Sequence, residues 1–148
     1  IAGKKGFLSI EVVKRNMSNM VGIVSGALDV LRKYEVSIEH LPSGIDSFNI
    51  VLAKKDVEHN LYEILADIKE RIAPDSIRVT EPLALIAIVG RNMNARAGSS
   101  GKLFTALGNA GVNIRMISQG SSEIDIIVGV ANADFDKAVR ALYQSFAR

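Results

Sequence analysis

Apolar and polar residues alternate along some stretches of the chain and follow helical spacing along others. Alternation or β-rich composition predicts strands at residues 8–12, 36–39, 47–52 and 76–80. Helical spacing predicts helices from just after Gly22 to Tyr34 and over about residues 60–72, the second ended by Pro74. The order β-α-β-β-α-β is that of the ferredoxin-like motif, an antiparallel sheet with both helices covering one face.

This pattern occurs twice. A shift of 76 residues aligns residues 8–52 with residues 84–128 without a gap, and 11 of the 45 aligned positions are identical. In the second copy we expect strands over 83–90, 112–117 and 123–130 and helices over 101–109 and 134–146. The chain is therefore predicted to be an α+β protein of two tandem ferredoxin-like units, residues 1–81 and 82–148. The second unit lacks its fourth strand, which we expect to lie either beyond Arg148 or upstream of Ile1 in a longer polypeptide; the family resemblance described below implies the upstream origin.

Each copy also carries the same candidate ligand-binding features: Arg-Asn-Met, a glycine that opens a helix, and a hairpin with small polar residues. They are Arg15-Asn16-Met17, Gly22 and Pro42-Ser43-Gly44 in the first copy, and Arg91-Asn92-Met93, Gly98 and residues 118–122 in the second. A glycine at a loop-to-helix junction allows close approach to the backbone, and the free N–H groups there favour a carboxylate. The alternative is that both glycines only make tight turns.

Composition excludes several classes of function. The chain has no cysteine, which excludes disulfides, thiolate catalysis and Cys-ligated metals and fits a reducing cytoplasm. A net charge of +2 and 5% aromatic residues without Trp indicate no nucleic-acid partner. No apolar run reaches the roughly 18 residues of a membrane span. His40 and His59 lie in different elements, and no phosphate-binding glycine motif occurs, so we expect no catalytic residue, metal or cofactor in this chain.

Two hairpins carry a resemblance to a known family. Residues 112–124 resemble the N-I-x-M-I-S-Q-G-S-S-E hairpin of aspartokinases, and residues 36–47 resemble the V-S-x-E-H-x-P-S-G-I-D stretch of their lysine-sensitive monofunctional branch. The helix at residues 135–143 is also similar, and the resemblance spans essentially the whole chain. It implies the C-terminal regulatory half of an aspartate kinase, with tandem ACT domains. The kinase domain, which would use ATP and magnesium to phosphorylate aspartate, is not among these residues.

The resemblance further implies an allosteric sensor of lysine, with threonine as a second candidate effector, that acts on a kinase domain in cis. It implies a homodimer paired through ACT units, with the effector at the interface, and a first unit inserted into the second. One departure is Gly98-Ser99-Ser100, where the family usually has Gly-Val-Ala. The implied effector pocket lies in the first unit and consists of Met17, Met20, Gly22, Ile23, Val24, Ser37, Ile38, Glu39, Asp46 and Ser47.

Two rival functions remain, an RNA-binding ferredoxin-like module and a dimerisation scaffold without a ligand. The RNA-binding module would need exposed aromatic residues on its sheet, and the expected strands supply only Phe48. One charge difference favours the first unit as the lysine site, because Glu39 aligns with Arg115, which cannot accept a hydrogen bond from an ammonium group. The alternative is that Glu39 is a solvated strand residue.

Overall fold

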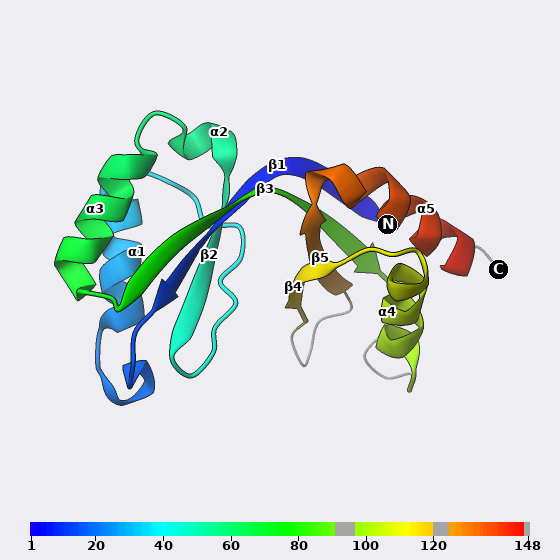
Figure 1. The fold of residues 1–148 in the computed structure, drawn as a ribbon, viewed down its shortest axis with the longest axis horizontal. Helices are drawn as coiled ribbons and strands as arrows, with labels where there is room; N and C mark the ends of the chain where they lie inside the picture. Colours follow the sequence, from blue (N-terminus) through cyan, green and yellow to red (C-terminus); the bar gives the residue numbers. More distant parts are fainter. Residues whose placement is uncertain (91–96, 120–124, 147–148) are drawn as a thin grey trace. The chain divides into compact units, whose positions relative to one another are not determined.

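The computed structural model describes residues 1–90, 97–119 and 125–146, and the chain forms two compact units (Figure 1). One unit is continuous, Phe7–Glu81, and is called the inserted unit below. The other, the split unit, combines Ile1–Gly6 with Pro82–Arg148. Each has an antiparallel sheet with helices on one face, which confirms the predicted α+β ferredoxin-like fold.

The inserted unit begins within strand β1 (Ala2–Val13) and ends within strand β3 (Ser76–Val89). Between them come the 3-10 turn η1 (Met17–Asn19), helix α1 (Ile23–Lys33), strand β2 (Ser47–Ala53), the short helix α2 (Lys54–Val57) and helix α3 (Leu61–Ile72). Helices α1 and α3 lie side by side on one face of the sheet (Figure 1). The expected helices are confirmed, whereas η1 and α2 had no signal in the hydrophobic pattern.

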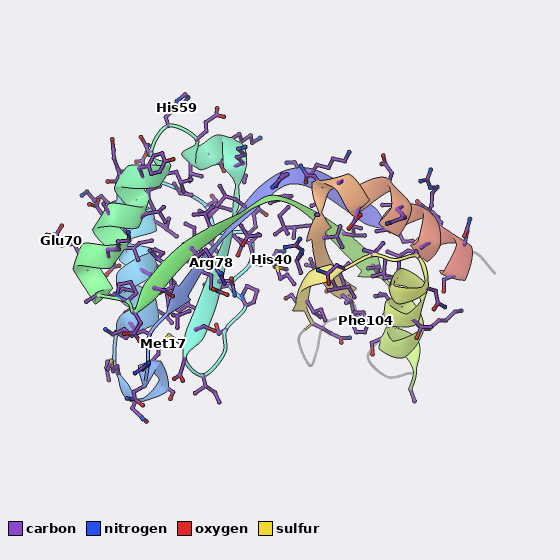
Figure 2. The ribbon with its side chains drawn as sticks, in the orientation of Figure 1. Met17, His40, His59, Glu70, Arg78 and Phe104 are labelled. Carbon is purple, nitrogen blue, oxygen red and sulfur yellow. The ribbon has the colours of Figure 1, made fainter. Side chains whose placement is uncertain are left out.

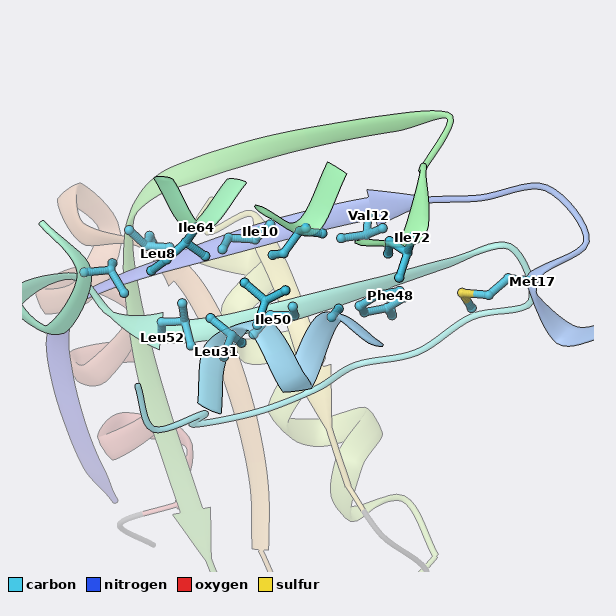
Figure 3. Packing of buried hydrophobic residues seen from close by; sticks show 14 residues of the cluster. Leu8, Ile10, Val12, Met17, Leu31, Phe48, Ile50, Leu52, Ile64 and Ile72 are labelled. Carbon is cyan, nitrogen blue, oxygen red and sulfur yellow. The ribbon is translucent and has the colours of Figure 1, made fainter. Parts of the chain in front are cut away.

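Alternate residues of β1 and β2 build the core of the inserted unit. The antiparallel register pairs Leu8 with Leu52, Ile10 with Ile50, and Val12 with Phe48, and these six side chains are at most 1% exposed. They meet apolar residues of α1 and α3, including Leu31 and Ile64 (Figure 3). Burying each such side chain contributes about 1.5–3 kcal/mol, so this two-residue alternation determines which face receives the helices.

The segment expected as a strand at residues 36–39 is irregular. It still lies along β2, where the Glu39 N–H donates to the Val51 carbonyl and the Val51 N–H donates to the His40 carbonyl, both at 2.9 Å. Two residues thus face one, which is a β-bulge. Further along, Pro42 accepts from the Asn49 N–H but has no N–H to return. The bulge and the proline together prevent a continuous ladder, and only isolated bridges remain at His40 and Ser43.

The split unit repeats this arrangement. After β3 come helix α4 (Ser99–Asn109), strand β4 (Ile114–Ser118), strand β5 (Asp125–Ala131), the 3-10 turn η2 (Asn132–Asp134) and helix α5 (Phe135–Phe146). Strand β5 pairs with β3 on one side and β4 on the other, and α4 and α5 cover one face (Figure 1). The aligned pairs Ile10/Ile86 and Leu31/Leu107 are each 0% exposed, as the repeat requires.

The fourth strand of the split unit is present in this chain, which corrects its expected origin upstream of Ile1. The two units divide after Glu81 as expected, but residues 1–6, expected in the first unit, belong to the split unit. Residues 2–6 of β1 belong to the split unit, and β1 is hydrogen-bonded to β3. Ile1 packs on the split unit's core, and Gly3 lies so close to Phe135 that a Cβ there would be 2.7 Å from the ring. The segment has two glycines and two lysines, so no alternation identified it as a strand.

Strand β3 is continuous, whereas the sequence predicted two strands, residues 76–80 and 83–90, separated at Pro82. Its pairing with β5 begins at Leu83, directly after the proline. A proline supplies no ladder N–H, so it is tolerated where the strand gains a new partner. Strands β1 and β3 therefore each contribute to both units, and the inserted unit enters and leaves through them.

Candidate functional site

The loop that leads into α1 and the first turn of that helix together carry half of the predicted pocket residues. Met17 begins η1 and is buried in the core (Figure 2). Met20 is 44% exposed, and Gly22 has a left-handed φ of +86° and precedes α1. No side chain caps this helix, and its first turn has no acidic residue. The N–H groups at the start of α1 are therefore open to an anionic group, and the helix dipole favours one there.

Asp46 joins the hairpin before β2 to this loop. Its carboxylate Oδ1 accepts from the Asn16 N–H at 3.2 Å, and its carbonyl accepts from the Lys14 N–H at 2.8 Å. Ser47 follows directly and is half-buried. The structure thus brings Asp46 and Ser47 to the end of the unit where α1 begins, as the pocket prediction requires, although the Asp46 carboxylate already serves the backbone of the loop.

Ser37, Ile38 and Glu39 lie elsewhere in the same chain. They follow the C-terminal end of α1, whose 11 residues span roughly 16 Å from the loop at its start. Glu39 is bonded to Val51, four residues along β2 from Ser47, or roughly 13 Å. The ten predicted residues therefore form two separate groups within one chain, and they do not surround one amino-acid-sized ligand in a single copy.

Several predicted pocket residues also have a structural role. Met17 is 7% exposed within the core cluster, and Ile23, Val24 and Ile38 pack partly buried against the same cluster. Ser37, Glu39 and Asp46 are exposed. Polar recognition by side chains in this set thus rests on Ser37, Glu39, Asp46 and Ser47, while the apolar members fix the backbone around them.

The equivalent positions of the split unit share the backbone but differ in chemistry. Gly98 also has a φ of +86° and precedes α4 without a side-chain cap. Arg115 sits at a β-bulge between Ile114 and Met116, so Glu39 and Arg115 occupy the same irregular position of the two units. Bulges redirect side chains and are frequent beside functional sites. Arg91-Asn92-Met93 and Gly120-Ser121-Ser122 lie outside the described residues.

A polar network between α1 and α3 was missed by the sequence reasoning. The Tyr34 hydroxyl donates to Asp67 Oδ2 at 2.6 Å, and Lys33 Nζ approaches the same oxygen at 3.2 Å. Arg71 pairs with Asp29 at 3.2 Å across the same two helices. The hydrogen bond to Asp67 raises the pKa of Tyr34 to about 12, and the bonds from Tyr34 and Lys33 lower the pKa of Asp67. These residues are more than 30 positions apart, so helical periodicity showed them only as polar positions.

Metal and membrane features were searched over residues 1–90, 97–119 and 125–146. Within these ranges, no three His, Asp or Glu side chains gather closely enough to hold a metal ion. Nor does any helix of these ranges combine the length and the apolar character needed to cross a bilayer. Phe48, the one strand aromatic considered for base stacking, is 0% exposed in the core and is unavailable to a nucleic acid.

Comparison with known proteins gives consistent matches. The ACT domain family profile matches residues 86–146. Aspartokinase 3 of Bacillus subtilis is 39% identical over 147 residues, which are 99% of this chain and 32% of that protein. The aspartate kinase structure of Clostridium acetobutylicum superposes with a TM-score of 0.95 at 44% identity, over 99% of this chain and 34% of that one. The chain thus spans about a third of the length of these relatives.

A third likeness is in fold. Escherichia coli aspartokinase III, solved in complex with lysine and aspartate, superposes with a TM-score of 0.81 at 22% identity, over 99% of this chain and 32% of that chain.

Proposed function

Since the chain is an ACT-domain region homologous to the regulatory domains of aspartokinases, we propose that it binds lysine as a feedback effector. Threonine is the second candidate effector. Binding would control a kinase domain, attached in cis, that phosphorylates aspartate with ATP and magnesium in the biosynthesis of these amino acids. The chain itself supplies no catalytic group to that reaction and acts through the equilibrium between states of the whole enzyme.

The observation that carries this proposal is the uncapped start of α1 at Gly22. Its N–H groups suit the α-carboxylate of an amino acid, and the absence of a Cβ at Gly22 allows close approach. Lysine also has two ammonium groups, which need acceptors. Glu39, Asp46 and the hydroxyls of Ser37 and Ser47 are the acceptors in the predicted set.

The predicted pocket residues form two separate groups within one chain, and this separation supports a pocket shared by two copies of the chain. Residues 36–43 form the outer edge of the inserted sheet, and a two-fold axis would pair this edge antiparallel with itself. In such a pair, the edge of one copy begins at Ser37 and lies beside the end of the partner copy's edge. That end continues into Asp46 and Ser47. A lysine held there would contact the α1 start and hairpin of one copy and Ser37–Glu39 of its partner.

The first test is calorimetric titration of the chain with lysine and with threonine. Glu39→Gln should weaken lysine binding by about tenfold or more, because a charged acceptor for an ammonium is lost. Arg115→Gln, the matched change at the equivalent bulge, should leave lysine affinity nearly unchanged. If Arg115→Gln abolishes binding and Glu39→Gln does not, the effector is not in the inserted unit.

Sedimentation with and without lysine tests the shared pocket. We expect the chain to self-associate and lysine to strengthen the association, since a ligand held by two copies must favour the dimer. A chain that dimerises but gives no heat with lysine or threonine is the scaffold of the rival hypothesis. A chain that stays monomeric at all accessible concentrations with lysine bound contradicts the shared pocket.

A further inference from the structure

We propose that Asp75 is a positioning residue for the effector loop, residues 14–22, and that it ties this loop to the start of β3. This inference rests on the proposed function for its ligand, but its geometry lies outside the predicted pocket. Asp75 sits in the turn between α3 and β3, immediately before Ser76. Its Oδ2 accepts from the Arg15 N–H at 2.7 Å, and its own N–H donates to the Val13 carbonyl at 2.8 Å.

Three consecutive loop amides are held from outside the loop. The N–H of Lys14 donates to the Asp46 carbonyl, that of Arg15 to the Asp75 carboxylate, and that of Asn16 to the Asp46 carboxylate. The loop start is thus fixed between two other segments of the unit. Charge-assisted hydrogen bonds to a carboxylate are stronger than neutral ones, so the two aspartates are the principal anchors.

The same junction contains two left-handed residues that are not glycine. Asn16 has a φ of +61° in the loop, and Ala73 has a φ of +46° at the end of α3. Lys14 Nζ donates to the Ala73 carbonyl at 2.7 Å, which joins the two sites. Such conformations cost energy and persist only where surrounding contacts enforce them. The bond from Lys14 and the bonds to the carboxylates of Asp46 and Asp75 are the contacts that enforce the loop conformation leading to Met17 and Gly22.

Asp75 also lies directly before strand β3, which contributes to both units. Strand β3 starts one residue later and runs without interruption from the inserted unit into the split unit. Any ligand that orders the effector loop also orders the Arg15–Asp75 bond, and by linkage that bond strengthens ligand binding.

The test combines two readouts on Asp75→Ala, Asp75→Asn and a control. Asn keeps an oxygen acceptor for the Arg15 N–H, whereas Ala removes it. The control is Asp29→Ala, which removes an exposed carboxylate that pairs with Arg32 and Arg71 and has no contact with the loop. Amide hydrogen exchange of residues 14–22 is measured without ligand, and lysine affinity is measured by calorimetry.

We expect Asp75→Ala to speed exchange at residues 14–17 and to raise the lysine Kd about tenfold, and Asp75→Asn to restore most of both. The control should change neither. Exchange and affinity that are unchanged in Asp75→Ala overturn the inference, as does an Asn variant as impaired as Ala. If wild type itself shows no heat with lysine or threonine, the proposed effector is wrong, while the exchange data still decide whether Asp75 positions the loop.

Discussion

The groove between α1 and α3 and the groove between α4 and α5 are equivalent parts of the repeat that differ in their charged residues. The first, about 410 Å³, is lined by Asp29, Val30, Lys33, Asp67, Glu70 and Arg71. The second is about 590 Å³, and its lining includes the aligned residues Thr105, Ala106, Asn109, Ala141, Gln144 and Ser145. Five charged positions in the inserted unit are thus neutral in the split unit. The same fold tolerates both because the apolar residues beneath the grooves are alike.

This difference distinguishes the apolar core, which both units share, from the polar links between the helices, which belong to the inserted unit. In the inserted unit, Tyr34–Asp67 and Arg71–Asp29 link the two helices from outside. The aligned positions of the split unit have no ionisable side chain, and the pairing of α4 with α5 there rests on packing. Exposed pairs of this kind are individually weak, so we expect the cores to dominate stability. The two links Tyr34–Asp67 and Arg71–Asp29, called the clamp below, are a local addition.

The largest expected effect tests the likeness of the two cores. Leu31→Ala and Leu107→Ala remove aligned side chains that are both 0% exposed, so each should cost about 2–5 kcal/mol of unfolding free energy. Denaturant unfolding combined with hydrogen exchange assigns each loss to its own unit. If one variant is nearly neutral, the two cores are not equivalent.

An intermediate effect tests how closely the helices approach. A Cβ at Gly26 of α1 would lie 2.8 Å from Cγ2 of Ile72 on α3, a stiff β-branched side chain. Gly26→Ala should therefore destabilise by about 1–2 kcal/mol net of its better helix propensity.

The matched control for Gly26 is Gly108→Ala in α4, where no atom lies within 4 Å of the added methyl group. It should stabilise by about 0.5–1 kcal/mol through helix propensity. If Gly26→Ala and Gly108→Ala shift the thermal unfolding temperature in the same direction, the close packing at Gly26 and the open space at Gly108 are contradicted.

The smallest effect concerns the clamp and its dependence on pH. Since Asp67 has a lowered pKa, its stabilising contribution is present above its unfolded pKa of 3.8 and is lost as the pH falls below it. Tyr34 has a pKa raised from 10.0 to about 12, so its contribution is present below pH 10 and is lost as the pH rises through about 12. Tyr34→Phe should remove the alkaline dependence from thermal unfolding of the inserted unit and reduce the acid dependence, since Lys33 still lowers the pKa of Asp67.

Tyrosinate absorbance provides a direct check on the same pair. In Asp67→Asn the Tyr34 hydroxyl loses its carboxylate partner, so the pKa of Tyr34 should fall toward 10.0. A Tyr34 titration identical in wild type and Asp67→Asn would show that the hydrogen bond does not form in solution.

Local patterns predicted much of the fold and part of the site. Gly22 and Gly98 were identified from the sequence as glycines at a loop-to-helix junction in each repeat. Both have a φ of +86°, a left-handed conformation that favours glycine. The positions of Glu39 on a bulge and of Asp75 on the effector loop were not predictable. They depend on bonds to Val51 and Arg15, and neither bond follows from periodicity.

The sequence by itself determined the two-fold repeat, the apolar faces and the helices, because these arise from local periods of 2 and 3.6 residues. Only the tertiary structure decided that residues 2–6 complete the split unit and that β3 passes through Pro82 into it. Strand pairing is a long-range choice made by burial and hydrogen-bond partners, and the glycines and lysines of residues 2–6 carry no local pattern for it. The close fit of Gly3 against Phe135, over 130 residues away, is one of the long-range contacts of that strand.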